Sequence, residues 1–239
     1  QLTFSVDIPL GTHSHQIMSK PAFTVVIFAI TTLLFCDPAN ADDWPRFRGA
    51  QGAGVATDSD AIPNVWSPLE NVAWKARLPG PGASSPIVVG EKVFVTCYSG
   101  YGVTKEQQSN LEDLVRNLIC IDLTTGAILW QNNIEASLPE DSYYKSGVSS
   151  HGYAAHTPVS DGKNVYTFFG KGGVFAFDLD GNELWRASAG KESDPPKWGS
   201  SSSPILYRDT LIVTASAESQ AVIGFDVETG QATWRQSAT

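Results

Sequence analysis

In the stretch Ile121-Asp122-Leu123-Thr124-Thr125-Gly126, an apolar strand runs into a turn of the pattern Asp-x-x-Thr-Gly, and Trp130 follows four residues later. The pattern returns twice, as Phe177-Asp178-Leu179-Asp180-Gly181 with Trp185 and as Phe225-Asp226-Val227-Glu228-Thr229-Gly230 with Trp234. The middle copy is one residue shorter. Self-similarity of this kind indicates a fold built from copies of one supersecondary unit.

Each copy contains the residue types that a tight hairpin with an anchoring aromatic side chain requires. The Asp can accept backbone N–H bonds from the turn, and the Gly supplies the positive φ that closes it. The Trp ends the following strand, where its ring can pack on the neighbouring repeat and bury roughly 150–250 Å². We therefore assign structural roles, and no catalytic one, to Asp122, Gly126, Trp130, Asp178, Gly181, Trp185, Asp226, Gly230 and Trp234.

A pair of strands precedes each of these turns. Ser84-Ser85-Pro86-Ile87-Val88-Val89, His156-Thr157-Pro158-Val159 and Ser202-Ser203-Pro204-Ile205-Leu206 each lead through a polar turn into a strand rich in β-branched and aromatic residues. Four strands per copy predict an all-β fold, a β-propeller of four-stranded antiparallel blades. About three blades are expected, at about 83–134, 153–190 and 200–237.

The pattern Asp-x-x-Thr-Gly-x-x-x-Trp resembles the tryptophan-docking motif of the pyrroloquinoline-quinone-like (PQQ-like) β-propeller repeat proteins. Asp43–Gly49 and Trp74–Gly80 are similar to the N-terminal signature of exported, planctomycete-type members, so the resemblance covers essentially all of 43–239. The family implies about seven or eight blades, and the chain is then expected to be an N-terminal fragment with an incomplete propeller. The sequence of segment 72–80 resembles the last strand of a blade, and this segment is predicted to be the strand that closes the missing last blade.

Composition agrees with a folded all-β chain. Hydrophobic residues make up 42% and charged residues 17%, while 21 Gly and 14 Pro suit many turns. The net charge of −9 and the pI of about 4.8 argue against a surface for nucleic acid or anionic membranes, which needs clustered Lys and Arg.

The residues before the repeats are predicted to direct export. Met18 and Lys20 are followed by an apolar run from Ala22 to Cys36 and by Ala39-Asn40-Ala41, which is the pattern of a signal peptide over 18–41. A retained membrane anchor is the alternative, although a spanning helix needs roughly 20 apolar residues.

We expect cleavage after Ala41. Phe35 is too bulky to precede a lipid-modified Cys36, and residues 1–17 are interpreted as a mis-called upstream extension. The remaining domain, 42–239, is then periplasmic or extracellular, with no membrane insertion.

The cysteines leave one question open. Cys97 and Cys120 fall on neighbouring predicted strands, so a disulfide is permissible in an exported protein, and buried free thiols are the alternative. The chain has no CxxC, HExxH or dense Cys/His cluster, and no metal site is predicted.

Three connections differ from the repeats. Within the insertion Tyr98–Asn117, the spacing of Leu111, Leu114, Val115 and Leu118 predicts a short amphipathic helix over Glu106–Leu118, either a lid or a loop packed on its own blade. Residues 135–157 and 191–203 either line a central ligand pocket or pack as ordinary loops. Their notable side chains are Tyr143, Tyr144, Lys145, His151, Tyr153, His156 and Trp198.

The resemblance implies two possible functions. The first is a non-catalytic scaffold or binding module with a protein or glycan partner, as in the outer-membrane assembly lipoproteins that share the repeat. The second is a quinoprotein alcohol dehydrogenase that uses PQQ, calcium and a catalytic Asp. Large quinoprotein alcohol dehydrogenases carry vicinal cysteines and a Glu/Asn/Asp calcium set, neither of which is recognisable here. The scaffold is therefore favoured, with no evident cofactor and no assigned catalytic or cofactor-binding residue.

Overall fold

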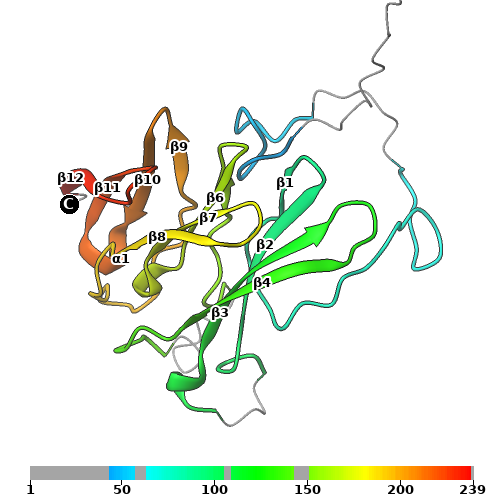
Figure 1. Ribbon diagram of the computed structural model, residues 1–239. Coiled ribbons are helices and arrows are strands. Elements are labelled where there is room, and N and C mark those ends of the chain that lie inside the picture. Colours follow the sequence, from blue (N-terminus) through cyan, green and yellow to red (C-terminus); the bar gives the residue numbers. More distant parts are fainter. Residues whose placement is uncertain (1–42, 57–62, 105–108, 143–150, 238–239) are drawn as a thin grey trace, which may run out of the picture. The chain divides into compact units, whose positions relative to one another are not determined.

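The computed structural model describes residues 43–56, 63–104, 109–142 and 151–237, which form three four-stranded antiparallel sheets with almost no helix (Figure 1). We call these sheets blades A, B and C. Blade A consists of β1 (Ile87–Val89), β2 (Lys92–Ser99), β3 (Val115–Asp122) and β4 (Ile128–Glu135). Blade B consists of β5 (Val159–Ser160), β6 (Asn164–Phe168), β7 (Val174–Asp178) and β8 (Glu183–Ala187). Blade C consists of β9 (Ile205–Tyr207), β10 (Thr210–Ala215), β11 (Ala221–Asp226) and β12 (Ala232–Ser237).

Within each blade the strands lie in sequence order, and the predicted all-β propeller-type fold is confirmed. The segments before the first strands are linked to one another. The Ser85 amide donates to Thr157 Oγ1 at 2.9 Å, and the Thr157 amide donates to Ser203 Oγ at 2.9 Å. The first strands of the three blades therefore converge, as strands around a propeller axis do.

The Asp-x-x-Thr-Gly turns are held by their aspartates. Asp122 Oδ1 accepts bonds from the Thr125 amide at 2.7 Å and from the Thr125 hydroxyl at 2.8 Å. Asp226 makes the same pair of bonds with Thr229, at 2.8 and 2.7 Å. These bonds stabilise the carboxylate, so the Thr hydroxyl and amide hold the pKa of both carboxyls below the ordinary value.

The tryptophans join consecutive blades. Trp130 donates its indole N–H to the Leu179 carbonyl of blade B at 3.1 Å, and Trp185 donates to the Val227 carbonyl of blade C at 2.8 Å. Gly230 has φ +71°, and a Cβ there would lie 2.5 Å from the Trp185 ring. The turn glycine is thus required both for its backbone conformation and for the space that the neighbouring indole fills.

Two apolar clusters separate the blades. Phe94, Leu118 and Phe177 belong to the cluster between blades A and B, and Phe168 and Phe225 belong to the cluster between blades B and C. All five side chains are almost fully buried. In β7, Phe175 and Phe177 belong to the first cluster and Val174 and Ala176 to the second, because successive side chains point to opposite faces of a sheet.

The amphipathic helix predicted within Glu106–Leu118 is wrong over the part that the structure describes. Only the short 3₁₀ turn η1 (Leu111–Asp113) forms, and β3 begins at Val115. Leu114 and Leu118 are buried together in the cluster between blades A and B. Residues four apart share one face of a strand as well as one face of a helix, so the spacing did not separate the two.

The cysteines do not face each other. Cys97 lies opposite Asn117 and Cys120 lies opposite Phe94 in the register of β2 and β3, so the two thiols point to opposite faces of blade A. Both are free and buried, which resolves the alternative left open by the sequence, and burial raises the pKa of Cys120 to about 11. No helix in the described ranges is long and apolar enough to cross a membrane.

Candidate functional site

Buried charged groups gather where the loops of blades A, B and C meet. They come from the start of β3, from the connections 136–158 and 188–204 between blades, from the 3₁₀ turn η3 (Gly170–Gly172) and from α1 (Ser216–Ser219). We call this group the loop-face cluster. Its members are Arg116, Glu140, Asp141, His156, Lys171, Ser200 and Glu218, together with the exposed Ser193, which hydrogen-bonds to Lys171 and Asp141.

The first ion pair of the cluster is bidentate. Arg116 Nη1 and Nη2 donate to Glu140 Oε1 and Oε2 at 2.7 and 2.9 Å, and the two side chains are only 3% and 2% exposed. The guanidinium also lies 5.6 Å from the centre of the Tyr153 ring. Such planar, doubly hydrogen-bonded geometry is what a buried pair needs to offset the loss of hydration.

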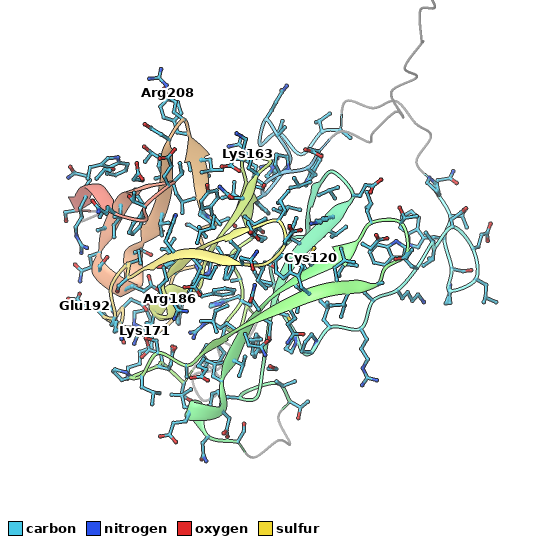
Figure 2. All side chains as sticks on the ribbon, viewed as in Figure 1. Cys120, Lys163, Lys171, Arg186, Glu192 and Arg208 are labelled. Carbon is cyan, nitrogen blue, oxygen red and sulfur yellow. The ribbon has the colours of Figure 1, made fainter. Side chains whose placement is uncertain are left out.

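The second ion pair links blade B to the connections on either side of it. Lys171 Nζ lies 2.9 Å from Asp141 Oδ2 and donates to Ser193 Oγ at 2.7 Å. The Ser193 hydroxyl in turn donates to Asp141 Oδ1 at 2.9 Å. Figure 2 shows Lys171 on the η3 turn beneath β8, in the region where Arg186 and Glu192 are also found. Lys171, Ser193 and Asp141 thus form one linked group.

The third interaction of the cluster is a hydrogen bond between Ser200 and Glu218 beside blade C. The Ser200 hydroxyl donates to Glu218 Oε2 and accepts a bond from the Ala217 amide at 3.1 Å. Glu218 is 2% exposed, and its Oε1 lies 2.9 Å from where a Cβ on Gly170 would be. The η3 turn thus contacts Glu218 on one side, and Gly172 approaches Arg116 on the other, so the cluster runs through all three blades.

His156 is the buried imidazole of the cluster. It is 5% exposed, its ring lies 4.5 Å from that of Phe168, and neither ring nitrogen makes a hydrogen bond of good geometry within the described residues. Burial, helped by the positive charge of Arg116, lowers the pKa of His156 to about 3. The imidazole is therefore neutral at ordinary pH.

The buried imidazole predicts a pH dependence of stability. Since its pKa falls from 6.5 to about 3 on folding, the unfolded chain binds the proton more readily, and stability is lost as the pH falls below 6.5. Between pH 6.5 and the folded pKa, each pH unit lowers the free energy of unfolding by about 1.4 kcal/mol. Urea unfolding at pH 6.5 and at pH 5 measures this change, and the expected loss is about 2 kcal/mol.

The matched variant is His156→Gln, whose free energy of unfolding is expected to vary much less over the same pH range. The lowered pKa values of Asp122 and Asp226 affect the free energy of unfolding only at a lower pH than this range, because the ordinary pKa of Asp is 3.8. An unchanged slope in the variant would assign the pH dependence to other groups.

A groove of about 560 Å³ opens beside the cluster, between β4 and the strands β7 and β8. Its walls carry positive and negative side chains and side-chain amides. Phe175 also lines the groove, and the Arg186 guanidinium lies 5.4 Å from the centre of its ring. This volume lies in the usual range for ligand sites. The lining includes Asn132, Asn133, Lys171, Glu183, Arg186 and Lys191.

The described residues contain no group of three or more His, Cys, Asp or Glu placed to hold a metal ion. The cysteines are neither adjacent in sequence nor on the same face of blade A. The carboxylates of the loop-face cluster already bind Arg116, Lys171 and Ser200.

The sequence-predicted residues are distributed as follows. The three Asp of the repeat are the last residues of β3, β7 and β11, the three Gly lie in the turns that follow, and the three Trp lie in β4, β8 and β12. Tyr153 is buried and donates to the Asp141 carbonyl at 2.7 Å, whereas Trp198 is 55% exposed. Tyr143, Tyr144 and Lys145 lie outside the described residues.

Sequence reasoning missed the charged members of the cluster. Lys171 carried the clearest signal, because it stands among glycines between two strongly apolar stretches, Tyr166–Phe169 and Val174–Phe177. A charge in such a place needs a buried partner. The partner of Lys171, Asp141, comes from a long connection whose path no local pattern specifies, as does Glu140, the partner of Arg116.

Comparisons with known proteins gave one family and several relatives. The family model described as outer membrane protein assembly factor BamB matches residues 111–239. A protein of Burkholderia pseudomallei (strain K96243) with that same name is 29% identical over 150 residues, which are 63% of this chain and 29% of the relative. The chain thus spans less than a third of that relative's length.

The chain is also similar to solved structures. The quinohemoprotein alcohol dehydrogenase of Comamonas testosteroni is similar over 84% of this chain and 28% of its own, with 15% identity and a TM-score of 0.52. BamB of Moraxella catarrhalis is similar over 68% of this chain and 48% of its own, with 18% identity and a TM-score of 0.33. At such identities the dehydrogenase likeness concerns the fold alone.

Proposed function

Because this chain belongs to the family of the outer membrane protein assembly factor BamB, a family of PQQ-like β-propeller repeats, we propose that it is a non-catalytic binding module with a protein partner. The family assignment supports a protein partner, since the Burkholderia relative is named as an outer membrane protein assembly factor. Neither the site nor the relatives' names point to a glycan.

One observation carries the proposal. The charged side chains of the loop-face cluster are engaged with one another across blades, with the Arg116–Glu140 and Lys171–Asp141 pairs 2–7% exposed. A general acid or base must reach a proton on a substrate within hydrogen-bond distance. Side chains that are buried and mutually paired suit a rigid scaffold better than a site for proton transfer.

We further propose that the protein is exported, to the periplasm or beyond the cell. The support is the signal-peptide pattern of residues 18–41, which lie outside the described residues, together with the outer-membrane role in the relative's name. The protein partner would then be met in the same compartment.

The test is dye-linked alcohol oxidation by the protein incubated with PQQ and Ca²⁺, with a known quinoprotein dehydrogenase as the positive control. We expect no alcohol-dependent dye reduction above the rate of free quinone. Saturable turnover that depends on both PQQ and Ca²⁺ would make the chain part of a quinoprotein alcohol dehydrogenase, the alternative function.

A further inference from the structure

The segment with the sequence Asp-Trp-Pro-Arg-Phe-Arg-Gly lies against the first strands of two blades. Trp44 forms a two-way backbone bridge with Val88 of β1, at 2.9 and 3.0 Å. The next residue, Pro45, accepts a bond from the Ser160 amide of β5 at 2.8 Å. Figure 1 shows the start of the described chain, in blue, beside β1. We call residues 43–54 the strap.

The strap occupies free strand edges. Within its blade β1 pairs only with β2, and β5 pairs only with β6, so the opposite edge of each strand has unpaired backbone groups. Such an edge is a template for an added strand. The strap fills both edges at once, and the Asp43 carboxylate accepts a bond from the Gly90 amide of the β1–β2 turn at 2.7 Å.

The rest of the strap folds on itself. Its amide bonds run from Gly49 to Arg46, from Gly52 to Gly49 and from Gly54 to Arg48, each within 3.0 Å. Gly49 has φ +77°, and a Cβ there would lie 2.8 Å from the Trp44 ring. The glycine therefore sets the position of the tryptophan, and the strap is a small structure of its own.

The stretch that follows the strap does little to hold it. In its described parts, residues 55–56 and 63–73, the hydrogen bonds run within the stretch, as between Ser67 and Glu70. Trp66 is 67% exposed and Leu69 is 99% exposed. The next anchor on the blades is Trp74, which donates to the Leu123 carbonyl at 2.8 Å. Release of the strap would leave that anchor in place.

We propose that the free edges of β1 and β5 form a peptide-binding site of the strand-addition type, which the protein's own strap occupies and can leave. The ligand class is an extended peptide with Trp-Pro followed by a glycine turn. Backbone bonds to Val88 and Ser160 give the affinity, and the Trp44–Gly49 contact within the peptide holds it in the bound conformation. The exposed tether keeps the strap at a high local concentration, so the site is normally filled.

Hydrogen exchange of single backbone amides tests whether the strap is separable. Gly49→Val, or Trp44→Ala as a second variant, is expected to speed exchange at Val88, Gly90 and Ser160 about tenfold or more, with the β2–β3 amides unchanged. Phe47→Ala, at a half-exposed neighbour, is the control and should change nothing. Unchanged exchange at the three amides, or equal acceleration of the β2–β3 amides, would overturn the proposal.

A peptide added in trans tests the site itself. A synthetic peptide of residues 42–54 is expected to restore slow exchange at Val88 and Ser160 of the Gly49→Val protein in a saturable manner. The same peptide with Gly49→Val is the control and should not. Failure of the native peptide at about millimolar concentration, the effective concentration of a short tether, would contradict a binding site.

Discussion

Replacing Trp185 by alanine is expected to lower the free energy of unfolding by about 3–5 kcal/mol, the usual cost of truncating a buried aromatic side chain. Trp185 is 8% exposed, packs against Gly230 and donates to the Val227 carbonyl at 2.8 Å. The substitution would leave a cavity between blades B and C and an unpaired carbonyl. Urea unfolding followed by circular dichroism measures the loss.

The chain provides its own control for this experiment. Trp234 occupies the same place in the third repeat, but it is 41% exposed and its indole makes no hydrogen bond to a residue that the structure describes. Trp234→Ala should cost about 1 kcal/mol or less, as exposed substitutions do. Equal losses for the two variants would mean that the contact between blades contributes little.

The second large effect is expected at the Arg116–Glu140 pair. Arg116→Met leaves the Glu140 carboxylate buried without its partner, and the expected cost is about 3–5 kcal/mol. Glu140→Leu should cost a similar amount, since it isolates the guanidinium. Both single variants are measured by urea unfolding at neutral pH.

The double variant separates pairing from burial. Arg116→Met with Glu140→Leu removes both charges, and similar-sized apolar side chains in such places are often neutral. We therefore expect the double variant to be more stable than either single variant, with a coupling energy of several kcal/mol. Additive losses would show that the two side chains act independently, against the geometry of two bonds at 2.7 and 2.9 Å.

The fold could be predicted because its information is local and repeated. Asp226, Gly230 and Trp234 follow one another within nine residues, and each has a role that can be argued from the turn it forms. Because the pattern occurs three times, it predicts the number of strands in each blade and their order. The error at Glu106–Leu118 arose where no repeat was available and a spacing of four residues suited both a strand and a helix.

The candidate site could not be predicted in the same way. Lys171 belongs to blade B and Asp141 to the connection after blade A, and the packing of the two blades brings them together. The sequence marks His156 as a loop residue, whereas the structure buries it against Phe168. Contacts between blades depend on how whole sheets pack, and no short pattern records that.

We propose, from the family assignment and the cluster, that this propeller binds a partner without a redox cofactor. The most direct measurement is a titration of the protein with PQQ in the presence of Ca²⁺, following the absorbance of the quinone. The account predicts no saturable change at micromolar quinone. A saturable, calcium-dependent change with a stoichiometry near one quinone per protein would contradict it.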